Sequence, residues 1–288
     1  MTTTTATRTA RRYARRTITF RLRRYDPEND TAPHWETRQL DVVEGMTVLE
    51  ALHELKHEQD PTLAWRSSCR MGICGSCGMF INGLPRLACQ TQVLHLEADV
   101  VEVAPLPNYP TVKDLVPDLE PMFQKHAAVK PHLIPANHLA DEVPTGEFLQ
   151  TPDQREEYGQ FSICIKCGLC MAACPTMATD LDFLGPQPLT QAYRYTVDSR
   201  DAGLRDRLEY LDALHGPFQC HLAGACTDAC PKGVDPALGI QLLKRTLSLE
   251  ALGLRRSKPV PQIMPLPTEF KPNDKIPQPP ARTVKPQG

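Results

Sequence analysis

The N-terminal part of the chain alternates between apolar and polar positions, as expected for strands that bury one face. Ile18, Phe20 and Leu22 form such an alternation and predict a first strand. A turn over Asp26–Asp30 leads to a second predicted strand near Glu36–Val43. The chain is therefore expected to open with two strands separated by a polar turn.

A short helix and a hairpin are predicted to follow. Thr47 and Glu50 form a capping box, in which each side chain can accept a hydrogen bond from the other residue's backbone N–H, so a helix is expected over 47–57. An Asn-Gly pair favours a type I′ turn and places a hairpin over 79–83, and Glu97–Val103 predicts a further strand. Together these elements predict a compact α+β unit.

The second half of the chain has a different pattern. A connector rich in proline carries one predicted helix over Asp118–Ala128, and beyond Pro152 the strand signals vanish. Further helices are predicted at Asp153–Phe161, Pro188–Ser199, Leu204–Leu214 and Pro236–Leu252. The last 32 residues hold nine prolines, which exclude a helix and predict an extended tail, either a strap on a partner or a disordered segment.

These patterns divide the chain into five segments. They are a basic disordered arm (1–16), an α+β domain (17–110), a connector (111–151), a helical domain (152–256) and a Pro-rich extended tail (257–288).

Charge and hydropathy narrow the function classes. The 288 residues carry 32 basic and 34 acidic side chains, and a net charge of −2 argues against a dedicated nucleic-acid binder. No run of 18 apolar residues occurs, so any membrane attachment is expected to come through a partner. The arginines of the N-terminal arm are not followed by an apolar stretch, so we expect no secretion signal. The arm is either solvated or contacts anionic lipids or an acidic partner.

Cysteine content decides the class of protein. Eleven cysteines are present, and an odd number in a chain of this length does not fit a secreted disulfide scaffold. A reducing compartment and thiols that act as metal ligands are expected instead.

The first cysteine motif predicts a 2Fe–2S site. Cys69, Cys74 and Cys77 follow the spacing C-x4-C-x2-C, and Cys89 comes after the predicted hairpin, as in plant-type 2Fe–2S ligation. The glycines between them let the backbone curl and bring N–H groups toward the sulfur atoms. The alternative is a zinc site with four cysteine ligands, although zinc ribbons use two matched C-x2-C pairs.

The second and third motifs form a pair. Cys164, Cys167, Cys170 and Cys174 follow C-x2-C-x2-C-x3-C-P, a run in which the fourth cysteine ligates the other cluster of a two-cluster ferredoxin. The partner run carries Cys220, Cys226 and Cys230, and superposition on the first run puts Ala223 where a second cysteine would stand.

The exchange of ligands assigns all remaining cysteines. Cys230 completes a 4Fe–4S cluster with Cys164, Cys167 and Cys170. The other site has only Cys174, Cys220 and Cys226, so a 3Fe–4S cluster is expected there. Two alternatives stay open: a water or hydroxide that caps a fourth iron, and zinc at both sites.

Five short stretches accompany these motifs: Ser68-Cys69-Arg70, Lys130-Pro131, Phe183-Leu184-Gly185-Pro186, Gln191-Ala192-Tyr193-Arg194 and Asp198-Ser199-Arg200-Asp201. With them, residues of about 17–252 resemble the iron–sulfur subunits of succinate dehydrogenases and fumarate reductases. The resemblance implies an α+β protein with an N-terminal ferredoxin-like (β-grasp) 2Fe–2S domain and a C-terminal, all-helical two-cluster ferredoxin domain.

The resemblance also implies partners and a location. A flavoprotein subunit with FAD would exchange single electrons with this chain, which would pass them through 2Fe–2S, 4Fe–4S and 3Fe–4S clusters to a quinone at a membrane-anchor subunit. The subunit would lie on the cytoplasmic face of the cell membrane, peripheral and held by the anchor. No G-x-G-x-x-G follows a predicted strand, so we expect no site for FAD or for the organic acid on this chain.

One departure from the family concerns the quinone. Ubiquinone-reducing members carry a tryptophan pair shortly after the C-P, whereas Cys174-Pro175 is followed here by Thr176 and Met177. Similar substitutions occur in menaquinone-using relatives whose anchor holds two haems, so the resemblance implies menaquinone and an anchor that contains haem b. His221 matches a family position beside the 3Fe–4S site; it either contacts quinone or haem or lies at a subunit interface without a redox role.

Two other functions are compatible with parts of the pattern. Paired cluster motifs also occur in relay subunits of soluble heterodisulfide-reductase or glycolate-oxidase type enzymes, and a zinc-stabilised interaction module belongs to a different class. Among the remaining residues, Arg194, Arg200 and Asp201 are interpreted as a salt-bridge group at a helix end. Trp35 and Trp65 are interpreted as packing residues.

Overall fold

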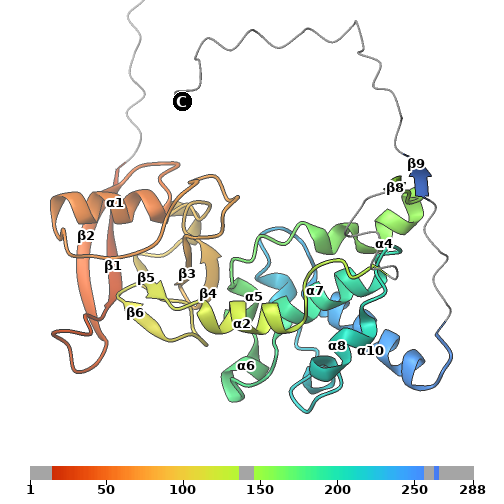
Figure 1. Ribbon diagram of the computed structural model, residues 1–288. Coiled ribbons are helices and arrows are strands. Elements are labelled where there is room, and N and C mark those ends of the chain that lie inside the picture. Colours follow the sequence, from red (N-terminus) through yellow and green to blue (C-terminus); the bar gives the residue numbers. More distant parts are fainter. Residues whose placement is uncertain (1–14, 136–145, 256–262, 266–288) are drawn as a thin grey trace, which may run out of the picture.

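The computed structural model describes residues 15–135, 146–255 and 263–265. Figure 1 shows a sheet domain at one end of the molecule and a helical domain at the other, with helix α2 (Glu120–Ala128) between them. The predicted arm up to residue 14 and most of the predicted tail lie outside the described residues.

A five-stranded sheet forms the first domain. Its order is β2-β1-β5-β3-β4, in which β1 pairs parallel with β5 and all other pairs are antiparallel. The strands are β1 (Arg16–Arg24), β2 (His34–Val42), β3 (Gly78–Ile81), β4 (Leu84–Leu87) and β5 (Val100–Ala104). Helix α1 (Val48–Glu58) lies across this sheet and buries five apolar side chains against it.

Local signals in the sequence explain these elements. Both halves of the predicted capping box are formed at the start of α1, where Glu50 N–H donates to Thr47 Oγ1 at 3.2 Å. Asn82 and Gly83 both have positive φ, as a type I′ turn requires. The last strand begins three residues later than predicted, because the 3₁₀ turn η1 (Leu94–Leu96) ends in Glu97 with a left-handed φ of 50°.

The segment after β5 contains a hairpin that the sequence analysis did not predict. Strands β6 (Thr111–Lys113) and β7 (Val116–Pro117) pair with each other, and the turn between them carries the buried Asp114. Its carboxylate accepts hydrogen bonds from Arg24 Nε at 2.9 Å and from the backbone N–H of Ala64 at 2.9 Å. The hairpin is thereby fastened to the sheet domain.

A second short pairing joins distant parts of the chain. Strand β8 (Gly146–Phe148) pairs antiparallel with β9 (Ile263–Pro265), so part of the predicted tail lies beside the predicted connector.

Helices form the second domain, as predicted. They are α4 (Pro152–Ser162), α5 (Leu169–Ala172), α6 (Pro175–Thr179), α7 (Pro186–Val197), α8 (Leu204–Leu211), η2 (Pro217–Gln219), α9 (Ala225–Asp228) and α10 (Pro236–Ala251). Helix α7 is the central element: most of its residues are buried, and it packs against α2, α4 and α10. None of the helices among the described residues combines the length and apolar character needed to cross a membrane.

The buried charges of this domain correct one prediction. Arg194 and Arg200 both pair with Asp198, at 3.6 and 2.9 Å. Asp201 instead pairs with the fully buried Arg207 at 2.8 Å. All three residues of the expected group therefore take part in ion pairs near the end of α7, but in two separate sets, because the partner of Asp201 comes from the next helix.

The two tryptophans differ in their surroundings. Trp65 packs against the core of the sheet domain, as predicted. Trp35 is 39% exposed and lies under the guanidinium groups of Arg21 and Arg23, with centroid distances of 5.0 and 5.3 Å. Trp35 therefore packs against two arginines on the outer face of β2 and not in the core, since the side chains of this strand alternate and Leu40 and Val42 are its buried residues.

Candidate iron–sulfur sites

The first cysteine loop curls around its own sulfur atoms. Cys69 Sγ accepts hydrogen bonds from the backbone N–H groups of Met71, Ile73 and Cys74, at 3.5, 3.3 and 3.2 Å. The curl needs left-handed backbone at three positions of the loop, and Gly72 (φ 70°) is one of them. Backbone donors therefore point at this sulfur as the glycine pattern predicts.

The fourth cysteine of this group comes from the far side of the hairpin. Ala88 N–H donates to the carbonyl of Cys77 at 3.0 Å, which brings the neighbouring Cys89 beside Cys77. Burial raises the pKa of the Cys77 thiol, and the charge of Cys89 acts in the same direction. A hydrogen bond from Ser76 lowers the pKa of the exposed Cys74 thiol. The loop thus holds one thiol poised to ionise and another that ionises only beside a cation.

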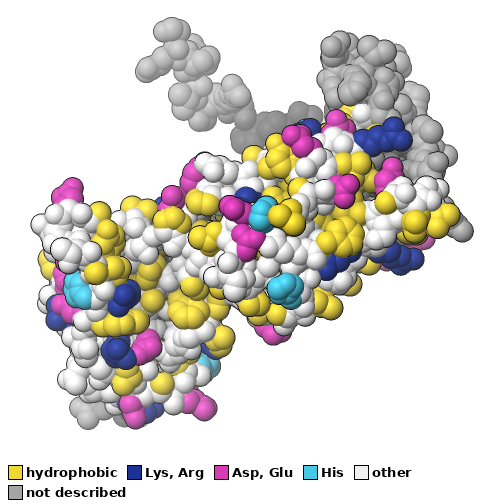
Figure 2. All heavy atoms as spheres, turned by 90° about the horizontal axis from the view of Figure 1, so that it is seen from below, with side chains coloured by type: hydrophobic (Ala, Val, Ile, Leu, Met, Phe, Trp, Pro, Cys, Tyr) yellow, Lys and Arg dark blue, Asp and Glu magenta, His cyan; other side chains and the backbone are white. Residues whose placement is uncertain are grey.

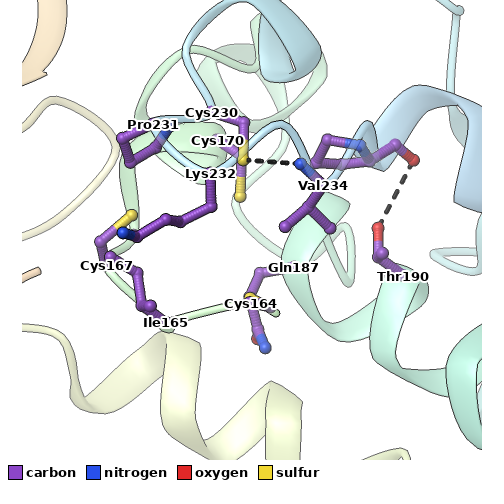
Figure 3. A pocket seen from close by; sticks show the side chains of 12 residues that line it. Cys164, Ile165, Cys167, Cys170, Gln187, Thr190, Cys230, Pro231, Lys232 and Val234 are labelled. Carbon is purple, nitrogen blue, oxygen red and sulfur yellow. Dashed lines mark hydrogen bonds between the residues drawn. The ribbon is translucent and has the colours of Figure 1, made fainter. Parts of the chain in front are cut away.

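Four cysteines of the helical domain line one cavity. Cys164, Cys167, Cys170 and Cys230 face a common pocket (Figure 3). The first three come from the loop that opens α5 and from α5 itself, and the fourth follows α9. Val234 N–H donates to Cys230 Sγ at 3.4 Å. These are the four residues that the sequence assigns to a 4Fe–4S cluster.

Burial dominates the electrostatics of this cavity. It raises the pKa of the Cys164, Cys167 and Cys170 thiols, and the mutual repulsion of the sulfur charges adds to the effect at Cys170. Buried thiols of this kind stay protonated until a cation compensates the charge, so metal binding would release their protons.

One polar residue of this cavity was missed by the sequence analysis. Gln187 of α7 is 2% exposed and lies beside Cys164 (Figure 3), where its hydrogen bond lowers the pKa of that thiol against the larger effect of burial. Its Nε2 also lies 3.2 Å from Nδ1 of His126. A single glutamine in a helix gives no sequence signal; only its place in the fold identifies it.

The three remaining cysteines line a second cavity. Cys174, Cys220 and Cys226 face a common pocket, together with Ala223 and His221. Leu222 N–H donates to Cys220 Sγ at 3.4 Å. Burial raises the pKa of the Cys226 thiol, and the charges of Cys174 and Cys220 add to it. The structure thus groups these cysteines as the ligand exchange in the sequence predicts.

The two loops of the helical domain share one backbone conformation. Lys166 and Gly168 have φ values of 56° and 81°, and the superposed Leu222 and Gly224 have 57° and 78°. Each loop leads into a four-residue helix, α5 or α9. This match places Ala223 at the position of Cys167, as the superposition of the sequences requires.

The first and second cysteine loops touch each other. A Cβ atom placed on Gly75 would lie 2.6 Å from Cβ and 2.9 Å from Cα of Cys167. A Cβ on Gly78 would meet Leu169 Cδ2 at 3.1 Å. Only glycine at position 75, with its φ of 76°, allows the 2Fe–2S loop to approach the other loop this closely.

The donor set fits iron–sulfur clusters. The cysteine thiols of the helical domain line two pockets and do not converge on a single point. Among the described residues, no group of three or more His, Cys, Asp or Glu side chains is placed to hold a single metal ion. Two cavities with four and three sulfur donors, and a curled loop with backbone N–H donors to sulfur, offer what clusters require.

Comparisons with known proteins agree with this interpretation. Residues 19–124 match the family model of the 2Fe-2S iron-sulfur cluster binding domain, and residues 160–234 match that of the 4Fe-4S dicluster domain. The predicted fold class and the 2Fe–2S and 4Fe–4S cofactors are thereby confirmed.

Relatives are found among the iron-sulfur subunits of fumarate reductase and succinate dehydrogenase. The fumarate reductase iron-sulfur subunit of Mycobacterium tuberculosis (strain CDC 1551 / Oshkosh) is 44% identical over 235 residues, which are 82% of this chain and 94% of the relative. The succinate dehydrogenase iron-sulfur subunit of Paracoccus denitrificans is 40% identical over 230 residues, which are 79% and 87%. A solved structure, the Mycobacterium smegmatis Sdh1 complex in the apo form, has a chain that matches with a TM-score of 0.72 and 26% identity, covering 83% of this chain and 98% of that one.

Proposed function

Since the chain belongs to the family of iron–sulfur subunits of fumarate reductase and succinate dehydrogenase, we propose that it relays single electrons between a flavoprotein subunit and a membrane-anchor subunit. Its role as the electron-transfer subunit of such an oxidoreductase follows from the family. We further propose which clusters the chain holds, which cysteines ligate them and in which order the electrons pass.

Contact between the three sites carries this proposal. Gly75 of the 2Fe–2S loop lies against Cys167 of the second site, and Cys170 and Cys174 are joined by less than two turns of backbone while they line different cavities. A chain of adjacent sites suits the transfer of electrons, and a structural module has no need of it.

The eleven cysteines divide into groups of four, four and three. Cys69, Cys74, Cys77 and Cys89 would hold the 2Fe–2S cluster, Cys164, Cys167, Cys170 and Cys230 the 4Fe–4S cluster, and Cys174, Cys220 and Cys226 the 3Fe–4S cluster. When bound, the clusters would supply the one-electron carriers. The protein's part is to supply thiolates, to donate backbone N–H groups to sulfur and to keep water from the second site.

The two ends of this chain of sites suit different partners. Met71 and Ile73, 67% and 55% exposed, project from the 2Fe–2S loop and would contact the flavoprotein with FAD. Phe218 and Leu222, 57% and 55% exposed, flank Cys220 and would contact the anchor. Figure 2 shows apolar side chains along the molecule on the face seen from below, among scattered charges. Exposed apolar side chains mark an interface when they gather in a patch, not when they occur singly.

The third site would deliver electrons to the membrane. His221 and Ala223 are exposed beside its cavity, and Thr176 and Met177 follow its C-P where ubiquinone-reducing members carry tryptophans. We therefore propose an anchor with haem b that serves menaquinone, on the cytoplasmic face of the cell membrane, with His221 in contact with the quinone or the haem.

Metal analysis and electron paramagnetic resonance (EPR) test the cluster content. Anaerobically purified complex should contain about nine iron atoms per copy of this chain, with acid-labile sulfide. The oxidised complex should show the signal of a 3Fe–4S cluster, and reduction by dithionite should reveal the two other clusters.

Two results would contradict the proposal. Zinc without labile sulfide would point to a zinc-stabilised module, and about ten iron atoms without an oxidised-state signal would mean that the third site holds a fourth iron.

A further inference from the structure

Two consecutive residues of the segment after β5 reach across to the second cysteine loop. Asn108 Nδ2 donates to the backbone carbonyls of Met171, Ala172 and Cys174, at 2.9, 3.2 and 3.2 Å. Tyr109 Oη donates to the carbonyl of Gly168 at 3.1 Å. One residue therefore contacts the end of α5 and the next contacts its beginning.

Asn108 serves as a cap that α5 cannot provide for itself. A helix of four residues leaves its last carbonyl groups without partners inside the helix. Two of them, those of Met171 and Ala172, converge on the Asn108 amide together with the carbonyl of Cys174, the N-cap of α6. Asn108 has a left-handed φ of 66°, which asparagine adopts more easily than most residues. The corresponding carbonyl in the repeated loop, that of Cys230, accepts instead from the backbone N–H of Gly233 at 3.3 Å.

Tyr109 lies where the two domains meet. Its ring packs against the apolar cores of both the sheet domain and the helical domain. A Cβ on Gly168 would lie 2.8 Å from the tyrosine oxygen, so the ring is in close contact with the loop. Burial raises the pKa of Tyr109, so its hydroxyl remains a hydrogen-bond donor.

We propose that Asn108 and Tyr109 are positioning residues for electron transfer, which hold both ends of the segment 168–174 against the sheet domain. That segment carries Cys170 and Cys174, which line different cavities. The pair thus fixes the second and third sites relative to each other and to the 2Fe–2S loop. This inference rests on the proposed cluster assignment.

Two variants remove these contacts with little other change. Asn108→Gly deletes the amide, and glycine accepts the left-handed backbone without strain. Tyr109→Phe deletes only the hydroxyl. Lys125→Met is the matched control, because Lys125 Nζ also donates to two carbonyls of the helical domain, but these belong to Leu181 and Phe183, outside the segment 168–174.

EPR of the purified complex reads the positions of the sites directly. In Asn108→Gly we expect near-normal iron and sulfide content, a broadened oxidised-state signal and a changed spin–spin interaction between the clusters. We also expect electron transfer to quinone to fall several-fold, because the rate of electron tunnelling decreases exponentially with the distance between the carriers. Tyr109→Phe should show the same changes to a smaller extent, and Lys125→Met should show none.

The outcomes separate this inference from the proposed function. If the wild-type complex lacks the three cluster signals, the proposed function fails. If the wild type shows them and both Asn108→Gly and Tyr109→Phe keep its spectra, even at lower melting temperature, the positioning role is overturned. If Asn108→Gly does not accumulate, Tyr109→Phe decides alone.

Discussion

The two cysteine loops of the helical domain have the same backbone and different surroundings. Gly168 and Gly224 occupy equivalent positions with φ values of 81° and 78°. A Cβ on Gly168 would meet Tyr109 Oη at 2.8 Å, whereas a Cβ on Gly224 would meet nothing within 4 Å. The first loop is covered by the sheet domain, and the second is open.

This difference matches the proposed roles of the two sites. The covered loop contacts the 2Fe–2S loop through Gly75, as an internal station in a relay requires. The open loop exposes His221, Leu222 and Ala223 around its cavity, as required of a site that hands electrons to a partner. The two loops share one backbone conformation, and their neighbours decide whether a partner can reach each site. A duplicated loop can therefore form an internal site and a terminal site of the same pathway.

The largest effect is expected from exchanging the one ligand that distinguishes the loops. Ala223→Cys gives the open loop a fourth thiol, so a 4Fe–4S cluster should replace the 3Fe–4S cluster. The iron content should rise from about nine to about ten atoms per chain, and the oxidised-state EPR signal should disappear.

The reverse exchange is its control. Cys167→Ala makes the covered loop resemble the open one, so the second site should lose one iron and a second oxidised-state signal should appear. An unchanged signal in Ala223→Cys would show that residue 223 does not face the third cluster, and the superposition of the two loops would be wrong.

A smaller effect is expected from adding a methyl group to the equivalent glycines. Gly168→Ala and Gly224→Ala both place alanine in left-handed backbone, at about 1–2 kcal/mol each. Only Gly168→Ala also presses on Tyr109, which adds about 1–3 kcal/mol of overpacking. Gly168→Ala should therefore lower the melting temperature of the complex more than Gly224→Ala.

Removal of the contact atom tests the cause of that difference. In the background of Tyr109→Phe the nearest remaining atoms, Leu119 Cδ2 and the ring carbon Cζ of residue 109, lie 3.3 and 3.4 Å from the added methyl. Part of the extra loss in Gly168→Ala should then be recovered. Equal effects of the two glycine changes would mean that the sheet domain does not cover the first loop.

Much of the architecture could be predicted because its causes are local. The capping box of Thr47 and Glu50, the Asn-Gly turn and the cysteine spacings each act within a few residues. The absence of a cysteine at position 223 could also be predicted, because Ala223 stands opposite Cys167 when the two cysteine motifs of the helical domain are aligned. The ligand exchange needed one further rule, that the fourth cysteine of such a run serves the other cluster.

Other features depend on partners far along the chain and could not be predicted. The β6–β7 hairpin is held by Asp114, whose partner Arg24 lies 90 residues away. Asn108 caps carbonyls 63 to 66 residues away. Gln187 was missed for the same reason. Polar residues of this kind have no periodic pattern, because one tertiary contact, and not the local chain, decides their role.

The smallest effect is expected from His126 of α2, whose ring lies beside Gln187 of the first helical-domain site. Burial, with a smaller contribution from the charge of Lys166, lowers the pKa of the half-buried His126 from 6.5 to about 4. The unfolded chain therefore binds a proton below pH 6.5 that the folded chain does not, so stability falls as the pH falls from 6.5 toward 4. Between pH 7 and 5 the loss of stability should be about 1 kcal/mol, after allowance for partial exposure to solvent.

The variant His126→Gln tests this prediction. It should remove this part of the pH dependence of the melting temperature and leave the trend above pH 7 unchanged. An identical pH dependence in wild type and variant would mean that water reaches this side of the covered loop, and the contrast with the open loop would be weaker than the contacts of Gly168 suggest.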